Sequence, residues 1–163
     1  MAAKFQLISK SPEETRSLGK TLGQSLVPGD TICLYGELGA GKTCLTQGIA
    51  QGLGIAQDEY VRSSSFVLCN EYTGGRIPLF HFDFYRMSRA EEALDIGFEE
   101  YASKEGVTVI EWADKFQEIL PEERVDIHFR IDDLYTRRLL ITIHYPEKRE
   151  KQLISSLKNP FSS

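Results

Sequence analysis

The sequence feature that most constrains this chain is a glycine-rich stretch that directly follows a short apolar run. The apolar run is Thr31-Ile32-Cys33-Leu34-Tyr35, and the glycine-rich stretch reads Gly36-Glu37-Leu38-Gly39-Ala40-Gly41-Lys42-Thr43. This stretch fits the pattern G-x-x-x-x-G-K-[ST], and apolar residues at helical spacing follow it. In this pattern glycines let backbone N–H groups turn inward around a chain of phosphates. We therefore expect a loop that binds a nucleoside triphosphate.

The side chains of this loop have distinct expected roles. Lys42 can reach the β- and γ-phosphates, and the hydroxyl of Thr43 can bind Mg²⁺. The helix that begins near Lys42 adds the positive end of its dipole at the same point. The expected nucleotide-binding residues of the loop are Glu37, Leu38, Gly39, Ala40, Gly41, Lys42 and Thr43.

Length and composition fit one cytoplasmic domain. The chain has 163 residues, of which 41% are hydrophobic, so we expect a single domain over residues 1–163 with one well-buried core. No apolar run approaches the roughly 20 residues of a membrane span, and three scattered cysteines suit a reducing compartment. The net charge of −5 argues against a protein that grips nucleic acid by itself.

The order of the expected elements predicts an α/β fold with a mixed central sheet. The apolar runs 31–35 and 107–110 are typical of buried parallel strands around a phosphate-binding loop. Alternating residues predict a hairpin over 66–85 and a C-terminal antiparallel hairpin over 125–145, which we expect to cover one face of the sheet. We therefore expect a three-layer sandwich like that of the P-loop NTPases.

Two carboxylates that end apolar strands are the candidates for chemistry beyond the loop. Hydrolysis of a nucleoside triphosphate needs Mg²⁺, a carboxylate on its side and a group that orients water. Glu111 ends the strand that shows the clearer pattern of a buried strand, so we expect it to be the carboxylate on the metal side. Asp83 ends the other strand, either as a second metal contact or as the base that orients water. The catalytic candidates are thus Lys42, Asp83 and Glu111.

Weaker candidates surround these residues. His81, Asp83 and Tyr85 alternate with three phenylalanines and form a polar strand face, which suggests a site. Arg86 and Arg62 are candidate stabilisers of charge. Ser63-Ser64-Ser65 lies where P-loop proteins place a segment that senses the γ-phosphate, and a plain flexible loop is the alternative.

Taken together, these motifs resemble the TsaE family (formerly YjeE), small bacterial ATPases of tRNA threonylcarbamoyladenosine biosynthesis. The phosphate loop is shared by many unrelated proteins, whereas other matching segments are more specific to this family. These are Thr15-Arg16-Ser17-Leu18-Gly19, His81-Phe82-Asp83-Phe84-Tyr85-Arg86, Glu91-Glu92-Ala93-Leu94 with Gly97, Ile110-Glu111-Trp112 and Leu120-Pro121. One segment departs from the family: Ser63-Ser64-Ser65-Phe66 stands where the family has S-P-T-[FY]. Ser65 keeps the hydroxyl of the switch, and the missing proline predicts a more mobile loop.

The resemblance implies a function and partners. It implies ATP bound at the loop, Mg²⁺ near Thr43 and Glu111, a part for Asp83 in hydrolysis, and Thr15 near the adenine end. It also implies that the ATPase supports repeated turnover of the TsaB–TsaD heterodimer, which modifies the adenosine beside the anticodon. tRNA would then be held largely by the partner. Separately, we expect slow ATP hydrolysis by the isolated chain, because its residues form no obvious complete catalytic apparatus.

Two other functions share the phosphate loop. A small-molecule kinase would carry an arginine-rich lid over its acceptor, and no obvious lid occurs in this sequence. A GTPase switch that acts only by binding would carry an N-K-x-D segment and a D-x-x-G segment, which this chain lacks.

Overall fold

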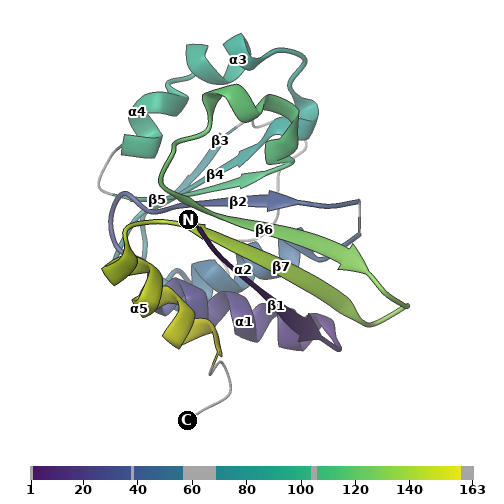
Figure 1. Cartoon of the computed structure of the whole chain (residues 1–163). Coiled ribbons are helices and arrows are strands. Elements are labelled where there is room, and N and C mark those ends of the chain that lie inside the picture. The colour runs from purple at the N-terminus through teal and green to yellow at the C-terminus, as the bar shows by residue number, and fades with distance from the viewer. Residues whose placement is uncertain (1, 38, 57–68, 104–105, 159–163) are drawn as a thin grey trace.

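The computed structural model describes residues 2–37, 39–56, 69–103 and 106–158, and these form a twisted mixed sheet between two layers of helices (Figure 1). The strand order in the sheet is β1-β7-β6-β2-β5-β4-β3. The strands are β1 (Ala3–Ser9), β2 (Thr31–Tyr35), β3 (Cys69–Tyr72), β4 (Leu79–Asp83), β5 (Val107–Glu111), β6 (Arg124–Ile131) and β7 (Arg137–His144). The helices are α1 (Pro12–Ser25), α2 (Lys42–Gly52), α3 (Ala90–Asp95), α4 (Phe98–Ser103) and α5 (Glu147–Lys158), with short 3₁₀ helices η1 (Phe84–Arg86) and η2 (Ala113–Ile119).

The centre of the sheet is parallel, as the apolar runs predict. β2 pairs in parallel with β5 on one side and with β6 on the other, and β4 pairs in parallel with β5. All five residues of β2 and of β5 are buried, since helices cover both faces of these strands. The carboxyl ends of β2, β4 and β5 therefore meet at one edge of the sheet, beside the glycine-rich loop.

The C-terminal hairpin is present, but the expectation that it covers a face of the sheet is wrong. β6 and β7 are antiparallel to each other, and β6 pairs with β2, so the hairpin extends the sheet sideways. β1 then pairs with β7 and closes that edge. The alternating pattern identifies which residues of a strand are buried, but a strand within the sheet alternates in the same way as a strand laid across it.

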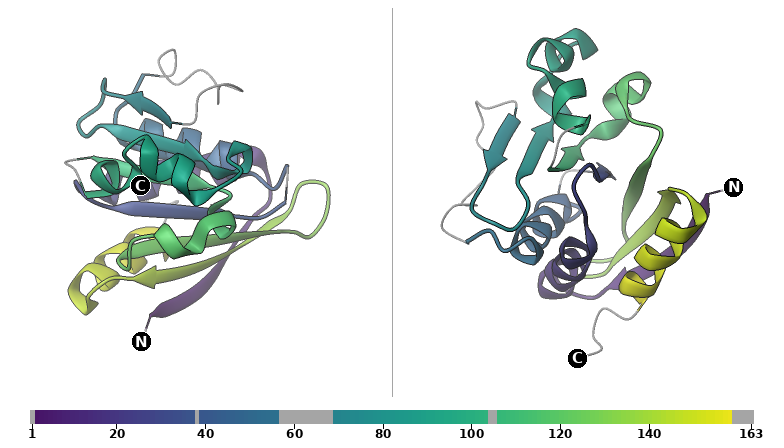
Figure 2. Two further views of the ribbon diagram at one scale, coloured as in Figure 1. Left: turned by 90° about the horizontal axis from the view of Figure 1, so that it is seen from above. Right: turned by 90° about the vertical axis from the view of Figure 1, so that its left-hand side faces the viewer.

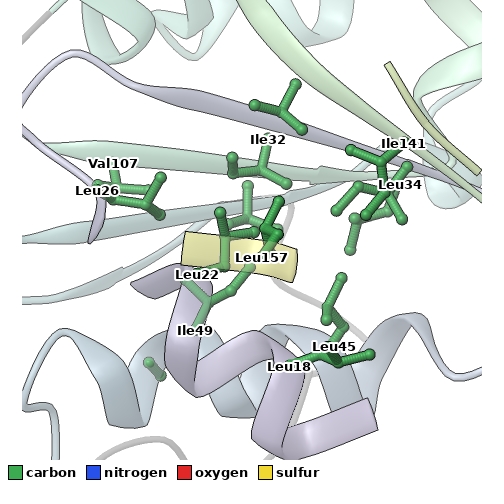
Figure 3. Close-up of a cluster of buried hydrophobic side chains, with 14 of the residues drawn as sticks. Leu18, Leu22, Leu26, Ile32, Leu34, Leu45, Ile49, Val107, Ile141 and Leu157 are labelled. Atoms are coloured by element: carbon green, nitrogen blue, oxygen red, sulfur yellow. The ribbon is translucent and has the colours of Figure 1, made fainter. Parts of the chain in front are cut away.

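The two helical layers enclose two apolar clusters, one on each face of the sheet. α1, α2 and α5 lie on one face, where Leu18, Leu22, Leu45 and Ile49 pack against the strands (Figure 3). α3, α4 and η2 lie on the other face over an aromatic cluster that includes Phe80, Phe82 and Phe98 (Figure 2). The three-layer α/β sandwich expected from the sequence is thus confirmed. Among the helices that the structure describes, none has the length and apolar character needed to span a membrane.

α1 begins where the residues Ser11, Pro12 and Glu14 favour a helix start. The hydroxyl of Ser11 accepts a hydrogen bond from the N–H of Glu14, and Pro12 occupies the first helical turn, where no N–H is needed. The Glu14 carboxylate in turn accepts a bond from the N–H of Lys10. This start places Thr15 in the first turn of α1, at the end that faces the glycine-rich loop.

Candidate nucleotide site

One cavity of about 330 Å³ lies at the edge of the sheet where β2, β4 and β5 end. It brings together most of the site residues expected from the sequence, although they lie up to 72 positions apart in the chain. Its lining consists of Gly39, Ala40, Gly41, Lys42, Thr43, Cys44, Asp83, Tyr85, Arg86, Glu111 and Trp112. Gly41 precedes α2 with φ 109°, a conformation that favours glycine, and supplies no side-chain cap to the helix. The N–H groups of the first turn of α2 are therefore available to an anion.

Lys42 is almost fully buried at the start of α2. Its Nζ donates hydrogen bonds to the carbonyl oxygens of Gly36 and Glu37, the latter at 2.9 Å, and lies 4.1 Å from the centre of the Trp112 ring. Burial lowers the pKa of Lys42, whereas nearby carboxylates, Glu111 first, act in the opposite direction. The ammonium thus bonds to groups of its own loop, at a point from which phosphate oxygens could replace those carbonyls.

Glu111 is a buried carboxylate that contacts both Thr43 and His81. The hydroxyl of Thr43 donates to Oε1 at 3.4 Å, and Nε2 of His81 lies 2.7 Å from Oε2. Burial alone would raise the pKa of Glu111, but the hydrogen bond and the charge of His81, with the charge of Lys42, outweigh it and hold the pKa low. The carboxylate is therefore ionised at neutral pH and accepts a hydrogen bond from the Thr43 hydroxyl.

The donor set around Glu111 fits Mg²⁺. Hydroxyl and carboxylate oxygens are the hard ligands that this ion takes, usually together with phosphate oxygens and water. Within the described parts of the chain, no group of three His, Cys, Asp or Glu side chains could hold a metal ion alone. Thr43 and Glu111 thus suit a metal ion that arrives with phosphate groups.

Asp83 lies at the same cavity but makes different contacts. It is the strand neighbour of Glu111 in the β4–β5 register. Its Oδ1 accepts a hydrogen bond from the N–H of Tyr85 at 3.0 Å, and its Oδ2 lies 3.6 Å from Nε of Arg86. The side chain of Arg86 is partly exposed and also lines the cavity. Asp83 therefore faces the same cavity as Glu111 from the neighbouring strand.

Thr15 lines a second, smaller cavity of about 90 Å³ that adjoins the first one. Gly39, Gly41 and Cys44 border both cavities. The smaller cavity is completed by the start of α1 with its cap residue, by the β6–β7 turn and by the start of β7, namely Ser11, Pro12, Leu134, Tyr135 and Arg137. Thr15 itself is buried, with its hydroxyl 2.6 Å from that of Ser9.

Two of the expected site residues lie outside the described residues. These are Leu38 of the loop and Ser65 of the switch segment. Arg62 and the neighbouring residues 63–66 lie outside them as well.

Three contacts at the site were not expected from the sequence. His81 is bonded to Glu111, Trp112 lies under Lys42, and an Nη2 of Arg137 donates to the carbonyl of Gly39 at 3.4 Å. Trp112 has φ 58°, the only positive φ among the described residues other than glycine, and its ring packs on Tyr85. The predicted polar strand face signalled His81 and Asp83 of β4, but its extension to Tyr85 is wrong, because the strand ends at Asp83 and Tyr85 lies in η1. Nothing local in the sequence signals Arg137.

Comparisons with known proteins agree with this geometry. Residues 9–139 match the family model described as threonylcarbamoyl adenosine biosynthesis protein TsaE. The chain is 44% identical over 117 residues to the tRNA threonylcarbamoyladenosine biosynthesis protein TsaE of Bacillus subtilis, covering 72% of each chain. It is 40% identical to the protein of the same name from Treponema pallidum, over 78% of this chain and 92% of that one.

A solved structure shows the same arrangement over nearly the whole chain. The crystal structure of Bacillus subtilis YdiB superposes with a TM-score of 0.78 and 34% sequence identity, and the match covers 97% of this chain and 96% of that one. The family model likewise spans the glycine-rich loop, His81, Asp83, Glu111 and Arg137. With sequence and fold in agreement over this length, the chain belongs to the TsaE family of tRNA threonylcarbamoyladenosine biosynthesis proteins.

Proposed function

We propose that this chain binds and hydrolyses ATP with Mg²⁺ and thereby supports turnover of the TsaB–TsaD complex in tRNA threonylcarbamoyladenosine synthesis. Membership of the TsaE family supports a role of this chain in that pathway. The observation that carries the ATP chemistry is the convergence of Lys42, Thr43 and Glu111 on one cavity at the carboxyl edge of the sheet. A buried lysine, a hydroxyl and an ionised carboxylate are the groups that phosphoryl transfer needs.

In the proposed reaction the loop binds the phosphate chain first. Lys42 exchanges its bonds to Gly36 and Glu37 for bonds to the β- and γ-phosphates, and the N–H groups at the start of α2 bind the same oxygens. Thr43 and Glu111 hold Mg²⁺, which when bound neutralises charge on the phosphates. The smaller cavity beside Thr15 receives the adenine end.

The remaining groups act on water and on developing charge. Asp83 either orients the attacking water or contacts the metal ion, and Arg86 beside it stabilises charge on the phosphates. The described residues place no further base or arginine in the cavity. This incomplete set supports slow hydrolysis by the isolated chain and stimulation by partners.

The proposed setting is the cytoplasm, in a complex with TsaB–TsaD. The net charge of −5 favours a division of labour in which tRNA is bound by the partner and only indirectly by this chain.

The experiment that tests the proposal measures phosphate release from ATP by the purified protein, alone and with TsaB–TsaD and tRNA. We expect slow turnover alone, faster turnover in the complex, and loss of both in Lys42→Ala. Fast turnover without partners would contradict partner regulation. A preference for GTP, or strong stimulation by one metabolite with a phosphorylated product, would instead favour a GTPase switch or a small-molecule kinase.

A further inference from the structure

Strands β1, β7 and β6 bury one face, and near the β6–β7 turn their other face is exposed, whereas Asp126 and Thr142 farther along that face are buried. Leu139, Ile141 and Ile143 of β7 point into the apolar cluster under α1, α2 and α5. The alternate residues point to the opposite side, where α3 and α4 lie over the other half of the sheet and not over these strands (Figure 2, left). We define the open face by its exposed residues, which are Lys4, Gln6, Ile8, His128, Arg130, Arg138 and Leu140.

Two aliphatic side chains of the open face are unusually exposed to solvent for residues of a sheet. The strand register aligns Gln6, Leu140 and His128 in one row across the three strands, and Ile8, Arg138 and Arg130 in another row two residues away. Leu140 lies on the middle strand and is 46% exposed, and Ile8 is 51% exposed. Because β7 has a strand on each side, Leu140 is accessible only from above the sheet, as a contact surface would require.

Lys4, Arg130 and Arg138 give the open face an excess of positive charge, and Asp132 is the acidic side chain beside them. Arg130 and Arg138 stand directly opposite each other on the antiparallel strands, an arrangement that is destabilising without a counter-charge. Asp132 pairs with Arg138 at 2.5 Å, whereas Arg130 has no ion pair within the described parts of the chain. The two rows contain no acidic residue, although the whole chain has a net charge of −5. A cationic patch on a protein of negative net charge favours the binding of an acidic ligand.

We propose that the open face is a docking surface for a protein that presents carboxylates to Arg130 and Arg138 and an apolar side chain to Leu140 and Ile8. Arginine beside exposed aliphatic residues is typical of protein interfaces. RNA-binding sheet faces instead display aromatic rings on which bases stack, and the two rows carry none except His128, whose ring is stacked on Tyr35 at 4.2 Å. The assignment of this protein as TsaB–TsaD rests on the proposed function.

The test measures the affinity of the full-length chain for purified TsaB–TsaD heterodimer by calorimetry, with Mg²⁺ and a non-hydrolysable ATP analogue. The informative variants are Arg130→Glu and Leu140→Ser. Their matched controls are Lys20→Glu on α1 and Leu94→Ser on α3, which change the same residue classes at exposed positions elsewhere. We expect each informative variant to bind at least about tenfold more weakly, and each control to stay within about twofold of the unaltered chain.

Further readouts separate the possible outcomes. Affinity for the ATP analogue and the thermal midpoint should be unchanged in Arg130→Glu, which shows that the loss is local. Heterodimer binding that survives both informative variants would overturn the docking surface and leave the proposed function standing. A chain that does not bind the heterodimer at all would overturn both. Binding of tRNA that is lost in Arg130→Glu would identify the face as an RNA surface and overturn the protein partner.

Discussion

At the scale of single residues, the site depends on how Glu111 is kept ionised inside the protein. A buried carboxylate would ordinarily be protonated more easily, but His81 at 2.7 Å and Lys42 nearby reverse that effect. The second oxygen of Glu111 is left to Thr43. His81 therefore acts through Glu111, as residues that orient metal ligands commonly do.

Replacement of His81 tests this dependence. In His81→Ala the carboxylate of Glu111 loses its hydrogen bond and its fixed orientation, so we expect ATP hydrolysis to fall by roughly 10–100-fold and the Mg²⁺ concentration for half-maximal activity to rise. Steady-state kinetics over a Mg²⁺ series checks this. His144→Ala is the control, because His144 pairs with Asp126 at 2.8 Å away from the cavity. Equal losses in both variants would indicate a general effect of a lost histidine–carboxylate pair.

The low pKa of Glu111 also predicts how stability depends on pH. Because the pKa is lower in the folded chain than in the unfolded chain, the ionised carboxylate stabilises the fold above about pH 4.3, and this contribution is lost as pH falls through the folded pKa. The unfolding free energy of the unaltered chain minus that of Glu111→Gln should therefore decrease below about pH 4.3. Urea unfolding without nucleotide or Mg²⁺ measures it, and a difference that is constant with pH would contradict the prediction.

At the scale of elements, local patterns in the sequence were sufficient for most strands and helices. β2, β5 and the hairpin of β6 and β7 lie close to their expected positions, since each has a clear period or end signal. The strand that lies next to the hairpin in the sheet could not be predicted, because nothing in the residues of β6 and β2 specifies that these two strands pair. The Arg137–Gly39 contact joins residues 98 positions apart and follows only from that placement.

The packing of α1 on α2 shows what glycine does in these helices. A Cβ on Gly48 would lie 2.1 Å from the carbonyl oxygen of Arg16, and one on Gly19 would lie 2.3 Å from that of Leu45. The glycines at 19, 23, 48 and 52 have the i, i+4 spacing of one helix face, so the two backbones come into direct contact. Gly52 is also the last residue of α2.

Substitution at Gly48 should therefore be costly despite the helix-favouring nature of alanine. Gly48→Ala must push α1 away from α2, and we expect the unfolding free energy to fall by about 3 kcal/mol. Gln24→Ala, at an exposed position of α1, is the control and should change it by no more than about 0.5 kcal/mol. Chemical denaturation of the two variants measures the difference. A tolerated Gly48→Ala would mean that the helices are not packed this closely.

At the scale of the whole molecule, the sheet joins the two proposed functional regions. Its β4–β5–β2 half ends in the proposed nucleotide site, and its β6–β7–β1 half carries the open face. The turn between β6 and β7 lies where the two regions meet, since Leu134, Tyr135 and Arg137 line the smaller cavity. Arg137 also donates to the carbonyls of Asp133 at 2.8 Å and Thr136 at 3.1 Å, so one side chain fixes the turn and reaches the loop.

This position of Arg137 gives a prediction about nucleotide affinity. In Arg137→Ala the turn loses its internal bonds and the loop loses the contact at Gly39, so we expect ATP to bind about fivefold more weakly, the effect of roughly 1 kcal/mol. Calorimetric titration with a non-hydrolysable analogue measures it. Arg89→Ala is the control, because Arg89 is an exposed arginine before α3 that lines neither cavity. If both variants bind as tightly as the unaltered chain, the turn does not support the loop, and nucleotide binding is independent of the β6–β7 half of the sheet.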